Sequence, residues 1–398
     1  MRKSSLFLCF ALCLLACTVN DHSENVTVVV SLDAFRWDYT DIYDTPNMNA
    51  IAAEGVKATM KPSFPASTFP NHYTLATGLY PDHTGIVNSS FWDGKTQKTY
   101  SMGDNETRND PYYYGGEPIW NTAQRQGVRA ANIYWVGSDI NINGSMPEIM
   151  HFWNDEPRFD YGGRVNEALR ILNLPEDERP RLLMVYFDDP DATTHEFGPT
   201  SIEGGIMVHY LDSLMGVLYN GIRALPYADK VNLIITADHG MTDISDNRFL
   251  CIADYVKDEW VEHIIGGTPT NIYSKPEYRD SILIALKDVE HISVWESGKV
   301  PEEYHYGTNS REGDIIVCPD CGWQFAWTKR GALGAHGYSP EESDMQVAFR
   351  ACGPDFKKGY VYDEVFPNVD LYPLLCTLLG IQPEPVDGKL ERVEALLK

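Results

Sequence analysis

The sequence is short of positive charge. It has 32 Lys and Arg against 57 Asp and Glu, and the formal net charge at pH 7 is -25. Binding to a nucleic-acid backbone depends on clustered Lys and Arg, so this composition argues against a nucleic-acid polymer as the partner. The acidity also means that overall charge repels an anionic substrate. Such a substrate would need a local positive group, such as a metal ion.

Long apolar runs are scarce as well. One run occupies residues 4–17 after the basic start at Arg2 and Lys3, and it is too short to span a bilayer. This pattern predicts a secretory signal peptide over residues 1–16. The run ends in Leu-Leu-Ala-Cys, which resembles a bacterial lipobox, so Cys17 is expected to carry lipid and residues 17–25 to form a tether. Leu15 is unusual in such a box, which leaves simple cleavage open. We therefore expect an exported protein, in the periplasm or on the cell surface, attached to the membrane only by lipid.

Cysteine is sparse after the predicted leader. The remaining residues are Cys251, Cys318, Cys321, Cys352 and Cys376. Cys318 and Cys321 form one CxxC pair, and no second pair completes a four-cysteine zinc site. A local disulfide between them is expected in an exported protein. The sequence leaves open whether Cys352 and Cys376 pair.

The chain lacks internal repeats and low-complexity segments after residue 26 and instead alternates strands with helices. Continuous apolar runs predict buried strands over residues 26–32, 181–187 and 231–237. Further strands are predicted over 56–60, 129–136 and 345–350, and helices over 46–55, 68–78, 119–127, 165–172, 208–224 and 372–379. The alternation predicts an α/β fold with a largely parallel central sheet flanked by helices, within a catalytic domain of residues 26–398. Residues 91–116 are expected to be irregular, and residues of about 245–335 to form a small cap-like insertion.

Acidic and histidine residues follow the three buried strands. They are Asp33, then Asp191 and His195, then Asp238 and His239, and His336 stands between glycines further on. The carboxyl ends of parallel strands lie along one edge of a sheet, so these side chains are expected to meet. Mixed carboxylate and imidazole ligands suit zinc. Each residue alone could equally be a helix cap or part of a turn.

The segment Thr68-Phe69-Pro70-Asn71-His72 opens the helix predicted to end at Gly78. A helix N-terminus attracts phosphate, and a hydroxyl placed there can attack a bound phosphoryl group. Threonine at this place is also a common helix cap. The segment by itself therefore does not decide between the two roles.

Together these segments resemble the nucleotide pyrophosphatase/phosphodiesterase family of the alkaline phosphatase superfamily. The matching stretches, in family order, are VVVSLDAFRWDY, KPSFPASTFPNHYTLATGLYPDHTGIVN, DPDATTHEFGP, IITADHGM and GAHGY. The resemblance implies an alkaline-phosphatase-like fold and two zinc ions. It implies one ion held by Asp191, His195 and His336, and the other by Asp33, Asp238, His239 and the Thr68 oxygen.

The resemblance also implies the chemistry. Thr68 would attack phosphorus to give a phosphothreonine intermediate, while Asn88 and the backbone N–H of Thr68 or Phe69 hold a non-bridging oxygen. A nucleoside 5′-monophosphate would be released from a phosphodiester or pyrophosphate. Phe69 is expected to stack on the nucleobase, with Tyr100 and Trp135 as further substrate-binding aromatic residues.

Two marker sets of related enzymes are missing. The arginine with which alkaline phosphatases grip a monoester is not found, nor is the sulfatase Cys-x-Pro-x-Arg around Thr68. A diester is therefore the expected substrate. The sequence leaves open a choline or phospholipid-type phosphodiesterase or a phosphonate hydrolase, because the aromatic, acidic residues 91–116 suit an ammonium group. It also leaves open a non-enzymatic surface binding protein.

Overall fold

The computed structural model describes residues 24–398, so the predicted signal peptide, Cys17 and most of the tether lie outside the described residues. The central element is an eight-stranded sheet with the order β18-β2-β17-β8-β1-β7-β5-β6. Its strands are β1 (Val26–Leu32), β2 (Val56–Lys61), β5 (Ala130–Ile133), β6 (Ile149–His151), β7 (Leu182–Phe187), β8 (Val231–Thr236), β17 (Val347–Cys352) and β18 (Tyr360–Pro367). Neighbouring strands run parallel except where β17 pairs with β2 and β8. The predicted largely parallel sheet is confirmed.

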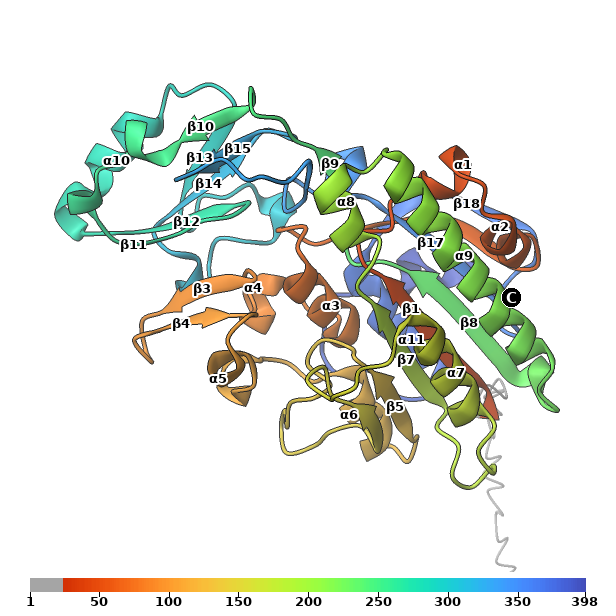
Figure 1. The fold of residues 1–398 in the computed structure, drawn as a ribbon. Helices are drawn as coiled ribbons and strands as arrows, with labels where there is room; N and C mark the ends of the chain where they lie inside the picture. Colours follow the sequence, from red (N-terminus) through yellow and green to blue (C-terminus); the bar gives the residue numbers. More distant parts are fainter. Residues whose placement is uncertain (1–23) are drawn as a thin grey trace, which may run out of the picture.

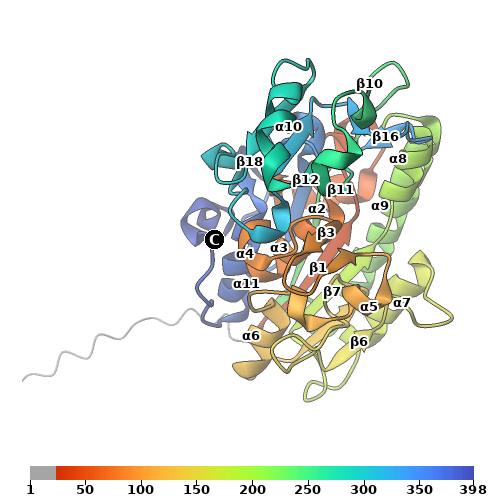
Figure 2. The same ribbon diagram turned by 90° about the vertical axis from the view of Figure 1, so that its left-hand side faces the viewer.

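Helices cover both faces of this sheet (Figures 1 and 2). One layer contains α2 (Pro46–Ala53), α7 (Tyr161–Leu172) and α9 (Ile202–Arg223), and the other contains α3 (Thr68–Thr77), α6 (Ile119–Arg125) and α11 (Leu371–Leu379). Every residue of β1, β7 and β8 is buried as a result. Strands covered on both faces need continuous apolar sequence, which is the pattern that predicted them.

The boundaries differ from the predictions at several places. Helix α9 begins at Ile202, earlier than predicted, because Ser201 caps it by accepting a bond from the Gly204 N–H. Residues 91–116 are not wholly irregular: they contain most of a hairpin of β3 (Ser90–Asp93) and β4 (Lys98–Ser101). Its cross-strand neighbours Phe91 and Tyr100 stack with ring centroids 4.6 Å apart, a contact that stabilises an antiparallel pair.

Residues 245–335 contain a second sheet of four antiparallel strands and their own apolar core. The strands are β11 (Val261–Ile265), β12 (Thr270–Ser274), β13 (Ile292–Glu296) and β14 (Ile315–Pro319), with α10 (Arg279–Leu286) packed on them. Figure 1 shows this insertion beside the carboxyl ends of the main strands. Cys318 and Cys321 are free thiols in the structure, so the expected local disulfide is not formed, and Cys352 and Cys376 are buried free thiols.

Several shorter elements lie outside the central sheet and the helices that cover it. They are α1 (Tyr39–Ile42), α4 (Pro81–Thr84), α5 (Asn105–Arg108), β10 (Phe249–Cys251) and β15 (Gln324–Ala326). Among residues 24–398, no helix combines the length and apolarity that crossing a membrane requires.

Gly240 marks a close approach between two backbone segments. Its N–H donates to the Met345 carbonyl oxygen at 2.9 Å, where the chain leaves β8 and passes the residues before β17. A Cβ placed on Gly240 would lie 2.0 Å from the Asp344 carbonyl oxygen. A backbone oxygen cannot swing aside as a flexible side chain can, so only glycine fits at this position.

We expect Gly240→Ala to lower the free energy of unfolding by about 3 kcal/mol, because the added methyl group forces the two segments apart. Gly94→Ala is the matched control, since a Cβ at Gly94 meets nothing within 4 Å. It should change stability by less than about 1 kcal/mol. Urea unfolding followed by tryptophan fluorescence measures both variants, and equal effects would contradict the packing explanation.

Candidate active site

The order of the strands brings the acidic residues together. Strand β1 lies between β7 and β8, with Leu32 opposite Phe187 and Ser31 opposite Thr236. Asp33 directly follows β1, and Asp238 lies just beyond the end of β8. Asp191 begins α8 (Asp191–Phe197), and its N–H donates to the Asp33 carbonyl oxygen at 3.1 Å. The three carboxylates therefore share the carboxyl edge of the sheet.

Two histidines join Asp191 from different parts of the chain. His195 lies one turn along α8, with Nε2 3.4 Å from Asp191 Oδ1. His336 directly follows β16 (Gly334–Ala335), which pairs with β9 (Thr242–Asp243) shortly after His239. This pairing places His336 Nε2 3.6 Å from Asp191 Oδ1. The His336 ring also stacks on that of His239, with centroids 3.8 Å apart.

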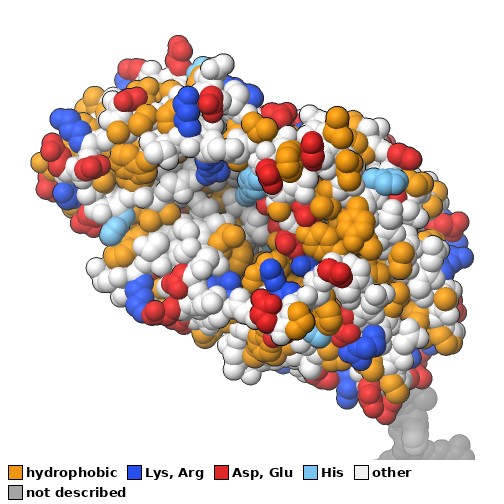
Figure 3. Space-filling view, in the orientation of Figure 1, with side chains coloured by type: hydrophobic (Ala, Val, Ile, Leu, Met, Phe, Trp, Pro, Cys, Tyr) orange, Lys and Arg blue, Asp and Glu red, His pale blue; other side chains and the backbone are white. Residues whose placement is uncertain are grey.

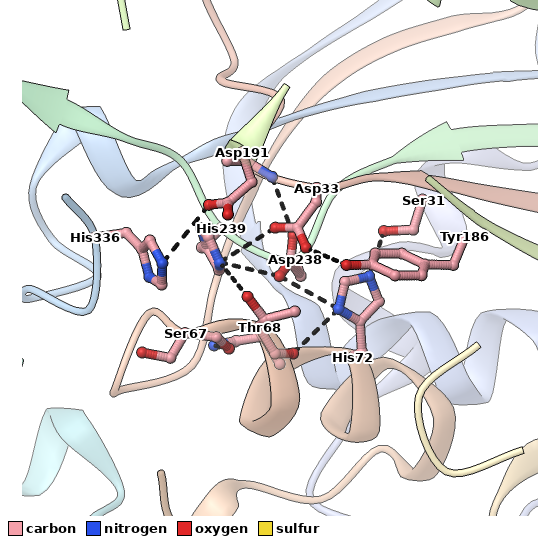
Figure 4. Close-up of polar contacts among 12 residues, drawn as sticks. Ser31, Asp33, Ser67, Thr68, His72, Tyr186, Asp191, Asp238, His239 and His336 are labelled. Atoms are coloured by element: carbon pink, nitrogen blue, oxygen red, sulfur yellow. Dashed lines mark hydrogen bonds and ion pairs between the residues drawn. The ribbon is translucent and has the colours of Figure 1, made fainter. Parts of the chain in front are cut away.

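A second group gathers around His239 (Figure 4). Its Nε2 lies 3.4 Å from Asp33 Oδ1 and 3.1 Å from Asp238 Oδ2. Thr68 Oγ1 lies 3.1 Å from the same nitrogen. The structure thus brings all the predicted ligand residues into one cluster: Asp33, Thr68, Asp191, His195, Asp238, His239 and His336.

The backbone fixes the tautomer of each histidine. Nδ1 contacts a carbonyl oxygen in all three: Gly334 at 2.8 Å for His195, Gly240 at 2.9 Å for His239 and Ala66 at 2.9 Å for His336. A carbonyl only accepts, so Nδ1 carries the proton and Nε2 presents a lone pair to the cluster. Burial lowers the pKa of His195 to about 4 and that of His336 well below its usual value, which favours the neutral ring.

The carboxylates have oxygens that no donor satisfies. Asp33 Oδ1, Asp191 Oδ1 and Asp238 Oδ2 are buried without a hydrogen-bond partner. Burial raises the pKa of Asp33 and Asp191 well above the usual value, and the nearby charge of Asp238 adds to the effect. Buried carboxylates in this state are unfavourable unless a cation compensates them. These oxygens and the imidazole lone pairs therefore fit divalent cations.

The ligand atoms form two groups of the size a metal ion needs. In each group the ligand atoms lie within 4.8 Å of one another: Asp191 with His239 and His336, and Asp33 with Asp238 and His239. His239 belongs to both groups. The cluster can therefore hold ions side by side rather than at separate sites.

Thr68 does not cap its helix. The N-cap of α3 is Ser67, and Thr68 is the first helical residue. The Thr68 hydroxyl faces His239 instead, so the cap interpretation is excluded. The N–H groups of the first turn have no partner within the helix, and they add positive potential beside that hydroxyl.

Two supporting residues were missed by the sequence analysis. Tyr186 donates its hydroxyl to Asp33 Oδ2 at 2.6 Å. His72 lies one turn after Thr68, with Nδ1 3.3 Å from Asp238 Oδ2 and Nε2 2.8 Å from Ser31 Oγ. Tyr186 is the penultimate residue of a predicted strand and His72 lies within the Thr68 segment, but their partners depend on which strands are neighbours.

A cavity of about 250 Å³ lies beside Thr68. Figure 3 shows the surface hollowed on this face between the insertion and the main sheet. Phe69 and Trp135 line the cavity. Further lining residues, which the sequence analysis did not single out, include Arg108, Tyr114, Tyr134, Asp139, Trp153 and Asp188. Tyr100 lies behind the wall, where its hydroxyl bonds that of Tyr114 at 2.8 Å, so it is not placed to stack on a ligand in the cavity.

Asn88 is buried and lies against the insertion. Its Nδ2 lies 3.3 Å from the Pro269 carbonyl oxygen and 3.3 Å from Asn271 Oδ1. Its Oδ1 accepts the N–H of Ser89 at 2.8 Å. Asn88 thus contacts the main domain and the insertion together.

Comparison with known proteins places the chain in one family. A family model described as type I phosphodiesterase / nucleotide pyrophosphatase matches residues 27–339. A venom phosphodiesterase of Crotalus durissus collilineatus is 35% identical over 94% of the chain and 47% of its own length. Ectonucleotide pyrophosphatase/phosphodiesterase family member 3 of Rattus norvegicus is 34% identical over 93% of the chain and 44% of its own length. The chain thus spans about half the length of these curated relatives.

The fold of the chain is also similar to that of solved structures. Murine ectonucleotide pyrophosphatase/phosphodiesterase 5, an inactive variant in complex with AMP, matches with a TM-score of 0.89 and 31% identity, over 94% of this chain and 100% of that one. The human form of that protein matches with a TM-score of 0.87 and 33% identity, over 94% and 100% of the two chains. The expected alkaline-phosphatase-like fold is confirmed. On these matches, the chain belongs to the type I phosphodiesterase / nucleotide pyrophosphatase family.

Proposed function

We propose that the protein is a metal-dependent phosphodiesterase and nucleotide pyrophosphatase that releases nucleoside 5′-monophosphates. The observation that carries the proposal is the Thr68 hydroxyl, which lies 3.1 Å from His239 Nε2 at the start of α3 and lines the cavity. The names of the relatives are those of phosphodiesterases and nucleotide pyrophosphatases. A structural neighbour in complex with AMP supports a nucleotide as the ligand.

We propose zinc as the metal because mixed carboxylate and imidazole ligands suit it. One ion would be held by Asp191, His195 and His336, and the other by Asp33, Asp238, His239 and Thr68. When bound, zinc supplies Lewis-acid stabilisation of developing charge and lowers the pKa of coordinated hydroxyl groups. Tyr186 holds Asp33 in place by donating to its Oδ2, as partners of metal ligands commonly do, and His72 Nδ1 lies 3.3 Å from Asp238 Oδ2.

The side chains can then be given roles in the reaction. Thr68 Oγ1 loses its proton to solvent and forms a bond to phosphorus as the bond from phosphorus to the leaving oxygen breaks, which gives phosphothreonine and a leaving group that takes up a proton from solvent. Water next attacks that phosphorus and releases the nucleoside 5′-monophosphate, restoring the Thr68 hydroxyl. The first-turn N–H groups of α3 and the Asn88 amide stabilise the non-bridging oxygens. Phe69 and Trp153, which both line the cavity, offer aromatic surface to a nucleobase.

We also propose that the protein is exported. The names of the relatives, a venom enzyme and an ectoenzyme, support this proposal. The lipid anchor at Cys17, and the membrane to which it would attach the protein, remain predictions from the sequence.

The substrate class is tested by comparing hydrolysis of three p-nitrophenyl compounds. We expect kcat/KM for thymidine 5′-monophosphate p-nitrophenyl ester and for bis-p-nitrophenyl phosphate to exceed that for p-nitrophenyl phosphate by about tenfold or more. The physical reason is that Arg108, the arginine in the cavity lining, already donates to Met102, Asn105 and Asn109 and is not free to grip a dianionic monoester. Release of p-nitrophenolate measures all three. Faster cleavage of the monoester would contradict the diesterase proposal, and faster cleavage of glycerophosphocholine than of ATP would redirect it to choline esters.

The nucleophile is tested by Thr68→Ala. We expect kcat to fall by about 10³-fold or more while bound zinc stays near that of the unmodified protein, because the six other ligands remain. Thr68→Ser is the matched control, since it keeps a hydroxyl at the same place and should retain part of the activity. Near-normal turnover by Thr68→Ala would rule Thr68 out as the nucleophile.

The metal is tested by elemental analysis of the purified protein. We expect about two zinc ions per chain. Their removal by a chelator should lower the melting temperature by about 5 °C or more, since buried carboxylates then lose their cation, and added zinc should restore both stability and activity. His336→Ala should retain less zinc than the unmodified protein. A chain that holds no divalent metal and is insensitive to chelation would contradict the assignment.

A further inference from the structure

One segment of the insertion contacts both Asn88 and the loop that carries His336: residues 267–271, which end the turn after β11 and begin β12. A Cβ placed on Gly337, next to His336, would lie 2.1 Å from the Thr268 carbonyl oxygen, so this segment packs directly against the loop that carries His336. Its other side contacts Asn88 through the Pro269 carbonyl oxygen and Asn271 Oδ1. The segment therefore lies between a predicted metal ligand and the residue expected to hold phosphate.

Asn271 is fixed from the insertion side. It is fully buried, and its Nδ2 donates to the Glu312 carbonyl oxygen at 2.7 Å and to the Tyr306 hydroxyl at 3.3 Å. Tyr306 in turn donates to the Val87 carbonyl oxygen at 3.1 Å, next to Asn88. Because a backbone carbonyl only accepts, the nitrogen of Asn271 must face Glu312, and its oxygen must face Asn88.

The orientation of Asn88 follows from two independent contacts. The Ser89 N–H requires an oxygen and Asn271 Oδ1 requires a donor, so Oδ1 of Asn88 faces Ser89 and Nδ2 faces Asn271. The two bonds from Nδ2 are long, at 3.3 Å each. Long neutral bonds are weak, so a charged phosphate oxygen can compete for the same N–H groups at small cost.

We infer that Asn271 is a positioning residue for Asn88, through which the insertion takes part in binding the non-bridging phosphate oxygen. The inference rests on the proposed function, in which Asn88 stabilises that oxygen. Without the Asn271 acceptor, the amide of Asn88 is held by fewer contacts and its N–H groups are less accurately placed for the transition state.

A double-mutant cycle tests the inference. With thymidine 5′-monophosphate p-nitrophenyl ester as substrate, we expect Asn88→Ala to lower kcat/KM by about 100-fold. Asn271→Leu, which is similar in size but offers no acceptor, should lower it by about tenfold in the unmodified protein. In the Asn88→Ala background, Asn271→Leu should lower kcat/KM by less than about twofold, because the Asn88 amide that Asn271 positions is no longer present.

Thr270→Val is the matched control. Thr270 is buried in the same segment, and its hydroxyl donates within the insertion, to the Gly267 and Phe325 carbonyl oxygens. Any effect of Thr270→Val should be the same with and without Asn88, which separates general loosening of the insertion from action through Asn88. If the Asn271→Leu protein does not fold, kcat/KM of Asn271→Ser is measured in its place in the same cycle.

Equal losses from Asn271→Leu in both backgrounds, or no loss in the unmodified protein, would overturn the inference. If Asn88→Ala leaves kcat/KM unchanged, both the inference about Asn271 and the proposed role of Asn88 are wrong. The role of Thr68 as nucleophile would still be tested separately by Thr68→Ala. Absence of diesterase activity in the unmodified protein would instead refute the proposed function, and the inference with it.

Discussion

Buried negative charge at the carboxyl edge of the sheet is the constraint on which the structure of the active site depends. Asp33, Asp191 and Asp238 each present an oxygen that no protein donor satisfies. Such a cluster is unfavourable in a folded chain unless cations occupy it. The fold places three neutral imidazole nitrogens and the Thr68 hydroxyl around the same point, which completes a set of ligands for divalent metal.

Backbone groups orient many of these candidate ligand side chains. Carbonyl oxygens of Gly334, Gly240 and Ala66 hold the three histidines with Nδ1 protonated. Helix α3 begins at Thr68, so its free N–H groups and the hydroxyl are presented together. Rigid elements therefore position the groups that metal and phosphate would contact, with little left to flexible side chains.

The insertion packs on the main domain through a shared apolar cluster as well as through polar contacts: its Tyr306 and Ile316 lie in one buried cluster with Phe64 and Val87. Its core, around Ile272 and Ile315, is separate from the core of the main domain. The turn before β12 and Asn271 within β12 also contact Asn88, and the same turn packs against Gly337.

The sequence by itself predicted six of the eight strands of the central sheet, the main helices and the candidate ligand residues, because apolar periodicity and the residues that follow each strand are local properties. Strands β6 and β18 and the strands of the insertion were not predicted. Tertiary structure decided what those residues face. Strand order placed β1 between β7 and β8, the pairing of β16 with β9 brought His336 to Asp191, and the hairpin placed Tyr100 behind the cavity wall rather than in it. Tyr186, His72 and Asn271 gained their roles only there, since a contact between residues distant in sequence depends on which elements pack together, and no local pattern records that choice.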